Sequence, residues 1–175
     1  MKTALLQVTM LLFAACAPPP TPAGRSDRVI ATTDEGVIRA NAEPVTSASI
    51  SASADAVFTV LPDVYRDLGV EVKFVDPATH SVGNKRFTKL YRFAGEPLDA
   101  YFGCGASPTG PIANSDRITI SAVSGVTPAG STSQLQTTVT AYAEDMSLSK
   151  GKISCVSTGK LEEKIRALVE KDLGQ

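Results

Sequence analysis

Few side chains in this sequence have the types and spacing that chemistry requires. His80 is the only histidine, and it lies in a predicted turn without a carboxylate partner that the sequence can assign, which favours a structural role over that of a catalytic base. No Cys-x-x-Cys spacing, Gly-x-Ser-x-Gly elbow or P-loop occurs. Glu162 and Glu163 are adjacent, and adjacent helical side chains diverge by about 100°. The sequence therefore predicts a non-enzymatic protein that holds no metal and no other cofactor.

Cys16 closes an N-terminal segment with the features of an export signal. Lys2 gives a positive start, residues 5–15 are mostly apolar, and two small residues precede the cysteine. A bilayer-spanning helix needs roughly 20 apolar residues, so this segment is typical of a removable signal peptide, residues 1–15. The run Leu12-Phe13-Ala14-Ala15-Cys16 resembles the lipobox of bacterial lipoproteins. It departs from the family at Phe13, because leucine is commoner at the third position before the cysteine. The resemblance implies cleavage before Cys16 and lipidation of its thiol.

The lipobox resemblance also implies a location. Because residue 17 is alanine and not aspartate, the family's sorting pattern implies the periplasmic face of the outer membrane, with the acyl chains as the contact to the membrane. Residues 16–26 contain four prolines, which favour an extended tether between the lipid anchor and the domain. An ordinary secretory signal, cut near Ala15 or Ala17, is the alternative.

Two cysteines remain after Cys16, namely Cys104 and Cys155. In an oxidising periplasm, two such cysteines in one domain are more often paired than free, so we expect a disulfide between them. The loop that it closes is long, and the bond would stabilise the fold by about 4 kcal/mol on the chain-entropy model. Two reduced thiols and an intermolecular bridge are the alternatives.

The charge of the chain excludes one class of partner. It carries 17 basic and 18 acidic side chains, and one of the basic side chains, Lys2, belongs to the signal. A nucleic-acid binder needs a basic surface that neutralises phosphates, so this near-balance argues against nucleic acid as a partner. The chain that follows the signal has the length of one domain plus a tail.

Hydrophobic periodicity and turn residues predict the elements. Residues 27–43 are expected to form a short hairpin or an extended arm, and residues 44–175 an α+β domain. Within that domain the expected first helix starts at Ser53, ends at Gly69 and is kinked or broken near Pro62. The expected terminal helix follows Ser157 and Thr158 and carries an apolar stripe. The expected strands are residues 44–52, 70–75, 86–93, 117–123, 134–142 and 149–156.

Short connections between most of these strands indicate an antiparallel sheet, whose apolar face needs a cover. We therefore expect a single antiparallel β-sheet packed on one face by the two helices. This order of elements resembles the helix-grip domains, including those of a lipoprotein component of the outer-membrane β-barrel assembly machinery. The runs Gly103-Cys104-Gly105 and Cys155-Val156-Ser157-Thr158-Gly159-Lys160-Leu161-Glu162 resemble the signature of a group of uncharacterised bacterial lipoproteins, which implies a compartment and a fold but no activity.

Two functional hypotheses follow. The first is a lipid-anchored envelope lipoprotein that acts as a binding or accessory module for an envelope protein, through residues 94–116 and the expected turn at residues 125–130. The second is a carrier of a small apolar ligand, held between the sheet and the terminal helix. The side chains that could line its cavity, or fill it as packed core, are Phe74, Phe87, Tyr91, Leu135, Val139, Ile165 and Val169.

Overall fold

The computed structural model describes residues 31–33, 36–38, 45–144 and 151–175. They belong to two units, Met1–Ala40 and Asn41–Gln175. In the first unit, β1 (Ala31–Thr33) pairs with β2 (Gly36–Ile38) as an antiparallel hairpin. The predicted lipidation site Cys16 and the predicted tether lie outside the described residues. The second unit contains every other helix and strand that the structure describes.

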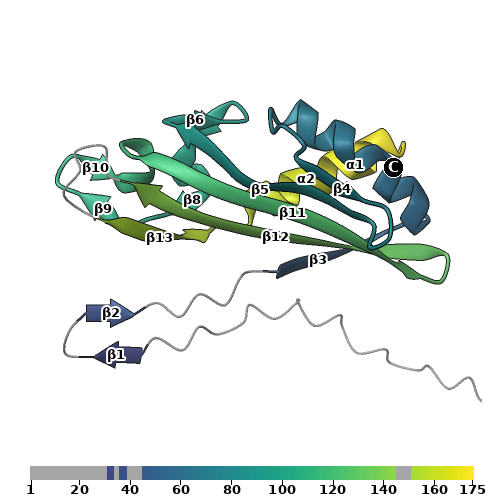
Figure 1. Ribbon diagram of the computed structural model, residues 1–175, viewed down its shortest axis with the longest axis horizontal. Helices are drawn as coiled ribbons and strands as arrows, with labels where there is room; N and C mark the ends of the chain where they lie inside the picture. The colour runs from purple at the N-terminus through teal and green to yellow at the C-terminus, as the bar shows by residue number, and fades with distance from the viewer. Residues whose placement is uncertain (1–30, 34–35, 39–44, 145–150) are drawn as a thin grey trace, which may run out of the picture. The chain divides into compact units, whose positions relative to one another are not determined.

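The second unit is built around a long antiparallel hairpin of β11 (Arg117–Ala129) and β12 (Thr132–Glu144), as Figure 1 shows. The two strands pair without interruption from Arg117 opposite Glu144 to Ala129 opposite Thr132. Gly130 has a φ of 71°, which the tight connection requires. The predicted turn at residues 125–130 is wrong, because the ladder continues through Gly125 as far as Ala129.

The other strands of the sheet attach to this hairpin. β5 (Ser81–Leu90) pairs with β11, and β4 (Phe74–Asp76) pairs with the start of β5. The far edge of β12 is shared by β3 (Val45–Ile50) and β13 (Lys152–Ser157), and β8 (Phe102–Gly103) pairs with β13. Every pairing of this seven-stranded sheet is antiparallel.

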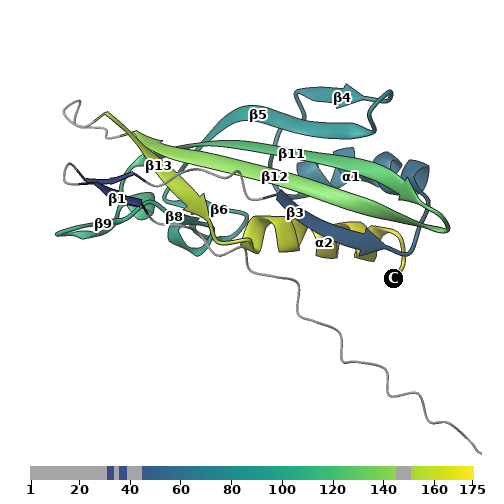
Figure 2. The ribbon, with the colours of Figure 1, turned by 90° about the horizontal axis from the view of Figure 1, so that it is seen from below.

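Two helices cover part of one face of the sheet, where they lie against each other (Figures 1 and 2). α1 (Ala54–Asp67) begins at Ser53, whose hydroxyl accepts a hydrogen bond from the Ala56 amide at 3.3 Å. It runs through Pro62 without the predicted break. α2 is Lys160–Asp172. Each helix buries an apolar stripe against the sheet: Val57, Leu61 and Val64 in α1, and Leu161, Ile165 and Val169 in α2.

The rest of the core is covered by an irregular segment between β5 and β11. It contains the pairs β6 (Arg92–Phe93) with β7 (Glu96–Pro97) and β9 (Ala106–Ser107) with β10 (Gly110–Pro111), and the 3-10 turns Leu98–Ala100 and Ile112–Asn114. Its buried anchors are Phe93, Leu98, Tyr101 and Phe102. The rings of Phe93 and Tyr101 lie 5.5 Å apart.

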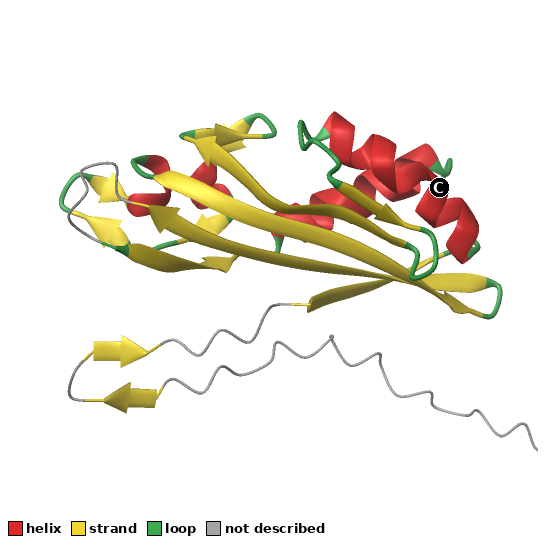
Figure 3. Ribbon diagram, in the orientation of Figure 1, coloured by secondary structure: helices red, strands yellow, loops and turns green. Residues whose placement is uncertain are grey.

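The structure therefore confirms the coarse prediction, an α+β protein with a mostly antiparallel sheet and two helices (Figure 3). The finer prediction of one sheet packed by helices alone is wrong. Separate two-stranded ladders accompany the main sheet, and an irregular segment contributes part of the core. Among the described residues, no helix has the length and apolarity that crossing a bilayer requires.

Two predicted strands differ from the structure. The alternation of residues 70–75 yields a ladder only from Phe74 onward, because Val70 is drawn into the core, where it is 2% exposed. β5 starts earlier than the predicted strand 86–93 and ends at Leu90, where Tyr91 takes a φ of 62°. A bulge lies between Asn84 and Phe87, opposite Ser121.

The expected disulfide is present. Cys104 and Cys155 are bonded, with a sequence separation of 51. Cys104 follows β8 and Cys155 lies in β13, so the bond ties the irregular segment to the main sheet. Thr158 ties the same two parts together, since its hydroxyl donates to the Ala100 carbonyl at 2.8 Å and its amide to the Tyr101 carbonyl at 2.9 Å.

Replacing both of these cysteines with serine should lower the free energy of unfolding of the mature protein by about 4 kcal/mol, because the unfolded chain regains the entropy of a long open loop. Urea unfolding followed by circular dichroism measures this difference. Wild-type protein unfolded in excess dithiothreitol is the control and should give the same value as the double variant. A loss below about 1 kcal/mol would contradict the expected loop contribution.

Candidate functional site

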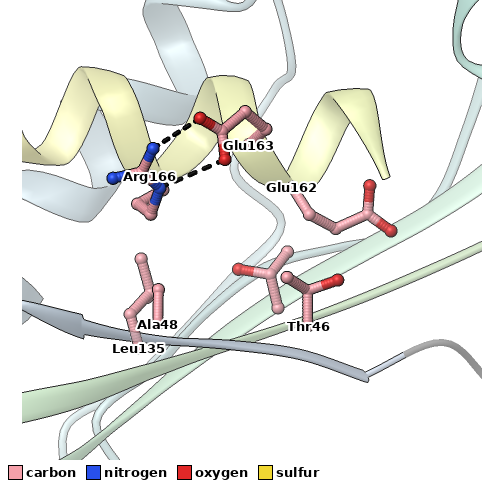
Figure 4. Close-up of a pocket in the computed structure, with 7 residues that line it drawn as sticks. Thr46, Ala48, Leu135, Glu162, Glu163 and Arg166 are labelled. Carbon is pink, nitrogen blue, oxygen red and sulfur yellow. Dashed lines mark hydrogen bonds and ion pairs between the residues drawn. The ribbon is translucent and has the colours of Figure 1, made fainter. Parts of the chain in front are cut away.

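A small groove lies between α2 and the strands β3 and β12 (Figure 4). Glu162, Glu163 and Arg166 project from the helix. The strands contribute Thr46, Ala48, Leu135 and Thr137. β3 forms one wall because it pairs with the first half of β12, with Ala48 opposite Leu135 and Thr46 opposite Thr137.

Glu162 is the unusual side chain of this groove. It is 2% exposed, although it stands beside the exposed Glu163. The Ser157 hydroxyl donates to its two carboxylate oxygens at 2.8 and 3.0 Å. Burial raises the pKa of Glu162 above its usual value, while its hydrogen bonds, including that from Ser157, lower it less. The two glutamates point apart, as the 100° step along a helix requires.

The neighbouring charges are paired at the surface. The Arg166 guanidinium forms ion pairs with Glu163 and, at 2.7 Å, with Glu170. The hydrogen bond from Arg166 lowers the pKa of Glu163, and the two carboxylates raise the pKa of Arg166. This exposed set stabilises one side of α2 modestly.

Behind the groove a buried chain of hydroxyl groups joins the first helix to the hairpin. Tyr65 of α1 shares a hydrogen bond of 3.0 Å with Ser124 of β11, and Ser124 shares one of 2.9 Å with Thr137 of β12. Burial raises the pKa of Tyr65, and the nearby Glu162 carboxylate adds to the rise. These hydroxyl groups are satisfied within the protein, as buried polar groups should be.

The size of the groove limits what it can bind. Its volume is about 20 Å³, which is room for a water molecule. Pockets for small-molecule ligands are many times larger. The groove therefore has room for a water molecule beside Glu162 and is too small for an organic ligand.

The side chains that the sequence proposed as a ligand site do not gather in one place. Leu135, Val139, Ile165 and Val169 are buried in the core, and only Leu135 lines the groove. Phe74 and Phe87 are half-buried on the strands β4 and β5. Tyr91 is 54% exposed beyond the end of β5. The carrier hypothesis stays a prediction.

Two arrangements of side chains could not be predicted from the sequence. The His80 Nε2 lies 3.0 Å from the Asp55 carboxylate, beneath the edge of the Phe58 ring. Asp55 follows the cap of α1 and His80 precedes β5, so their sequence positions gave no signal for this contact. The burial of Glu162 was equally hidden. Among the residues that the structure describes, no three His, Cys, Asp or Glu side chains are grouped so that they could hold a metal ion.

A second candidate site is the free edge of β5. β4 pairs only with Ser81, Val82 and Gly83, so no described strand pairs with residues 84–90 on the side away from β11. Leu90 and Tyr91 end this stretch with 37% and 54% of their surface exposed. We call residues 85–91 the edge segment. An open edge presents unpaired backbone amide and carbonyl groups, which can pair with another strand.

Comparisons with known proteins leave the family open. No family model matches the sequence, and no curated protein matches it. A solved DUF4468 family protein from Bacteroides ovatus is similar in structure, with a TM-score of 0.35 and 10% sequence identity. The match covers 71% of this chain and 64% of that one, so the chain spans less than two thirds of its neighbour. The lipobox and helix-grip resemblances remain predictions.

The two adjacent glutamates should respond to pH with opposite signs. Because the pKa of Glu162 is raised in the fold, its contribution to stability is full below the ordinary glutamate pKa and is lost as the pH rises through the raised value. Glu162→Gln has no such loss. The free energy of unfolding of this variant, relative to wild type, should therefore rise between about pH 4 and about pH 7.

Glu163→Gln is the matched control. Because the pKa of Glu163 is lowered, its contribution to stability is full above the ordinary glutamate pKa and is lost as the pH falls through the lowered value, so the free energy of unfolding of this variant, relative to wild type, should fall between about pH 3 and about pH 5. Urea unfolding at several pH values measures both differences. A flat or falling difference for Glu162→Gln would show that its carboxylate is not disfavoured in the fold.

Proposed function

We propose that this protein is a lipid-anchored lipoprotein on the periplasmic face of the outer membrane, where it acts as a non-enzymatic binding module for another envelope protein. One observation carries the binding role. The described domain has an open strand edge that ends in exposed Leu90 and Tyr91, whereas its groove has room for a water molecule only. An accessible strand edge is a common means of protein recognition.

The anchor is supported by the lipobox-like run ending at Cys16 and by the proline-rich residues after it. The disulfide between Cys104 and Cys155 agrees with an oxidising compartment such as the periplasm. The helix-grip resemblance belongs to the same proposal, since two helices lie on one face of an antiparallel sheet. The resemblance supports a fold that exposes surfaces and a strand edge to binding partners, and it implies no chemical reaction.

Cys16→Ser should abolish lipidation. Cells expressing the wild-type protein should incorporate a labelled fatty acid into it and retain it in the membrane fraction, since several acyl chains anchor a protein firmly. The serine variant should lack the label and leave that fraction. Intact mass spectrometry is the second readout, because cleavage near Ala15 or Ala17 without an acyl mass would support the ordinary secretory signal instead.

The binding role is tested by photo-crosslinking in intact cells. A photoreactive residue is placed singly at Thr88 on the β5 edge, at Gln136 on the sheet face away from the helices, or at Ala167 on α2, all of which are exposed. We expect an adduct with a defined envelope protein from Thr88 and none from Ala167. An adduct from Gln136 alone would keep the binding role but place it elsewhere. No adduct from any position would overturn the role.

A further inference from the structure

Part of the edge segment has free backbone for one more strand, namely residues 87–90, because the Arg86 amide already donates to the Asn84 side chain at 2.9 Å. The Lys73 amide donates to the Gly83 carbonyl at 3.0 Å, and the Asn84 side chain donates to the Glu71 carbonyl at 2.8 Å. The chain that precedes β4 therefore approaches β5 through its backbone at Gly83 and through the side chain of Asn84, and further along the Lys89 ammonium reaches the Gly69 carbonyl at 2.9 Å. Beyond the bulge, residues 87–90 continue β5 over about 10 Å at 3.4 Å per residue, which is the length of a short strand.

This edge gathers cations that lack a carboxylate partner among the described residues. In that part of the chain, Arg66, Lys73, Lys152, Lys160, Lys164 and Arg166 each form an ion pair with a carboxylate. No described carboxylate pairs with Lys85, Arg86 or Lys89, and Arg117 is the β11 residue opposite Leu90. Arg92 differs, because its guanidinium donates to the Gly95 carbonyl and its charge lowers the pKa of Glu96. Lys89 instead donates to the Gly69 carbonyl at 2.9 Å, and the Lys85 ammonium lies 5.2 Å from the centre of the Phe74 ring.

Tyr91 adds an apolar contact at the end of the edge. Its φ of 62° is unusual for a large side chain and is held by the hairpin of β6 and β7, because the Leu98 amide donates to the Tyr91 carbonyl at 3.1 Å. Backbone strain of this kind persists where the surroundings fix it, and it is frequent at binding sites. An exposed tyrosine in a fixed position loses little entropy when it is covered.

The same features disfavour pairing between two copies of this chain. Edge-to-edge contact would oppose one row of cations with another, and the bulge between Asn84 and Phe87 interrupts a flat edge. An acidic strand avoids the first penalty, because opposite charges on neighbouring strands attract.

We propose that the edge segment is the docking site for an extended acidic segment of a partner protein, which adds to the sheet as a strand beside β5 and covers Leu90 and Tyr91. This inference rests on the proposed binding function and names its partner by chemistry. Backbone hydrogen bonds supply the pairing, and Lys85 and Arg86 select for acidic side chains.

The test uses the full mature protein and three synthetic heptapeptides in fluorescence anisotropy. The first alternates glutamate and valine and ends in tyrosine, the second replaces glutamate with lysine, and the third is the acidic peptide N-methylated at alternate amides. We expect the acidic peptide to bind, more weakly as salt rises, and the lysine peptide not to bind. N-methylation should abolish binding, because it removes the amides that pair with an edge.

The variant Lys85→Glu/Arg86→Glu should weaken binding of the acidic peptide at least tenfold. Lys171→Glu, an exposed cation on α2, is the matched control and should leave it unchanged. Circular dichroism confirms that each variant folds. Equal binding by the N-methylated peptide, or by the edge variant, would overturn strand addition. So would absence of binding to the acidic peptide together with binding to anionic phospholipid vesicles. In-cell crosslinking from Thr88 separates these outcomes from a failure of the binding function itself.

Discussion

The pairing of β11 with β12 is the constraint on which the rest of this structure depends. Two strands of 13 residues each, joined through Gly130, give every other strand of the main sheet a direct or indirect partner. β12 is long enough for β13 to pair near its end and β3 near its start. A shorter hairpin could not bring residue 45 and residue 157 onto the same edge.

The hairpin also fixes the helices. Its inward face is apolar except at Ser124, Ser133 and Thr137. Near its middle, Ser124 shares one hydrogen bond with the Tyr65 hydroxyl and another with Thr137. A net hydrogen bond contributes only about 1 kcal/mol, but a buried hydroxyl left without a partner costs roughly 1–3 kcal/mol. If α1 were shifted along its axis by one turn, the Tyr65 hydroxyl would be buried in the core without a hydrogen-bond partner. The buried hydroxyl groups therefore select one position of α1 on the sheet, whereas apolar contacts alone would allow several positions.

Much of the fold could be predicted from the sequence wherever an element is specified by its own residues. Ser53 as a cap and the apolar steps from Val57 to Val64 located α1, and alternation located the centres of β11 and β12. The errors arose where the outcome depends on distant contacts. Gly125 and Pro128 favour a turn, yet the ladder to β12 holds them in a strand. The burial of Glu162 could not be predicted from its neighbours in sequence, because it depends on β3, which lies more than a hundred residues earlier in the chain.

The open edge of β5 is a consequence of how the core is filled. Val70 is buried beneath the end of α1, so the chain that follows cannot also run along β5 from its start. Its backbone meets β5 at Gly83 and Asn84, β4 is left with three residues, and the Gly69 carbonyl accepts a hydrogen bond from the Lys89 side chain. Gly83 is needed at this junction, because a Cβ there would lie 2.4 Å from the Ala122 carbonyl oxygen. The burial of Val70 thus draws the chain away from β5 and leaves the edge open beyond Asn84. An edge that is open for this reason needs protection from its own copies, and its cations and bulge provide that protection while leaving it accessible to an acidic strand.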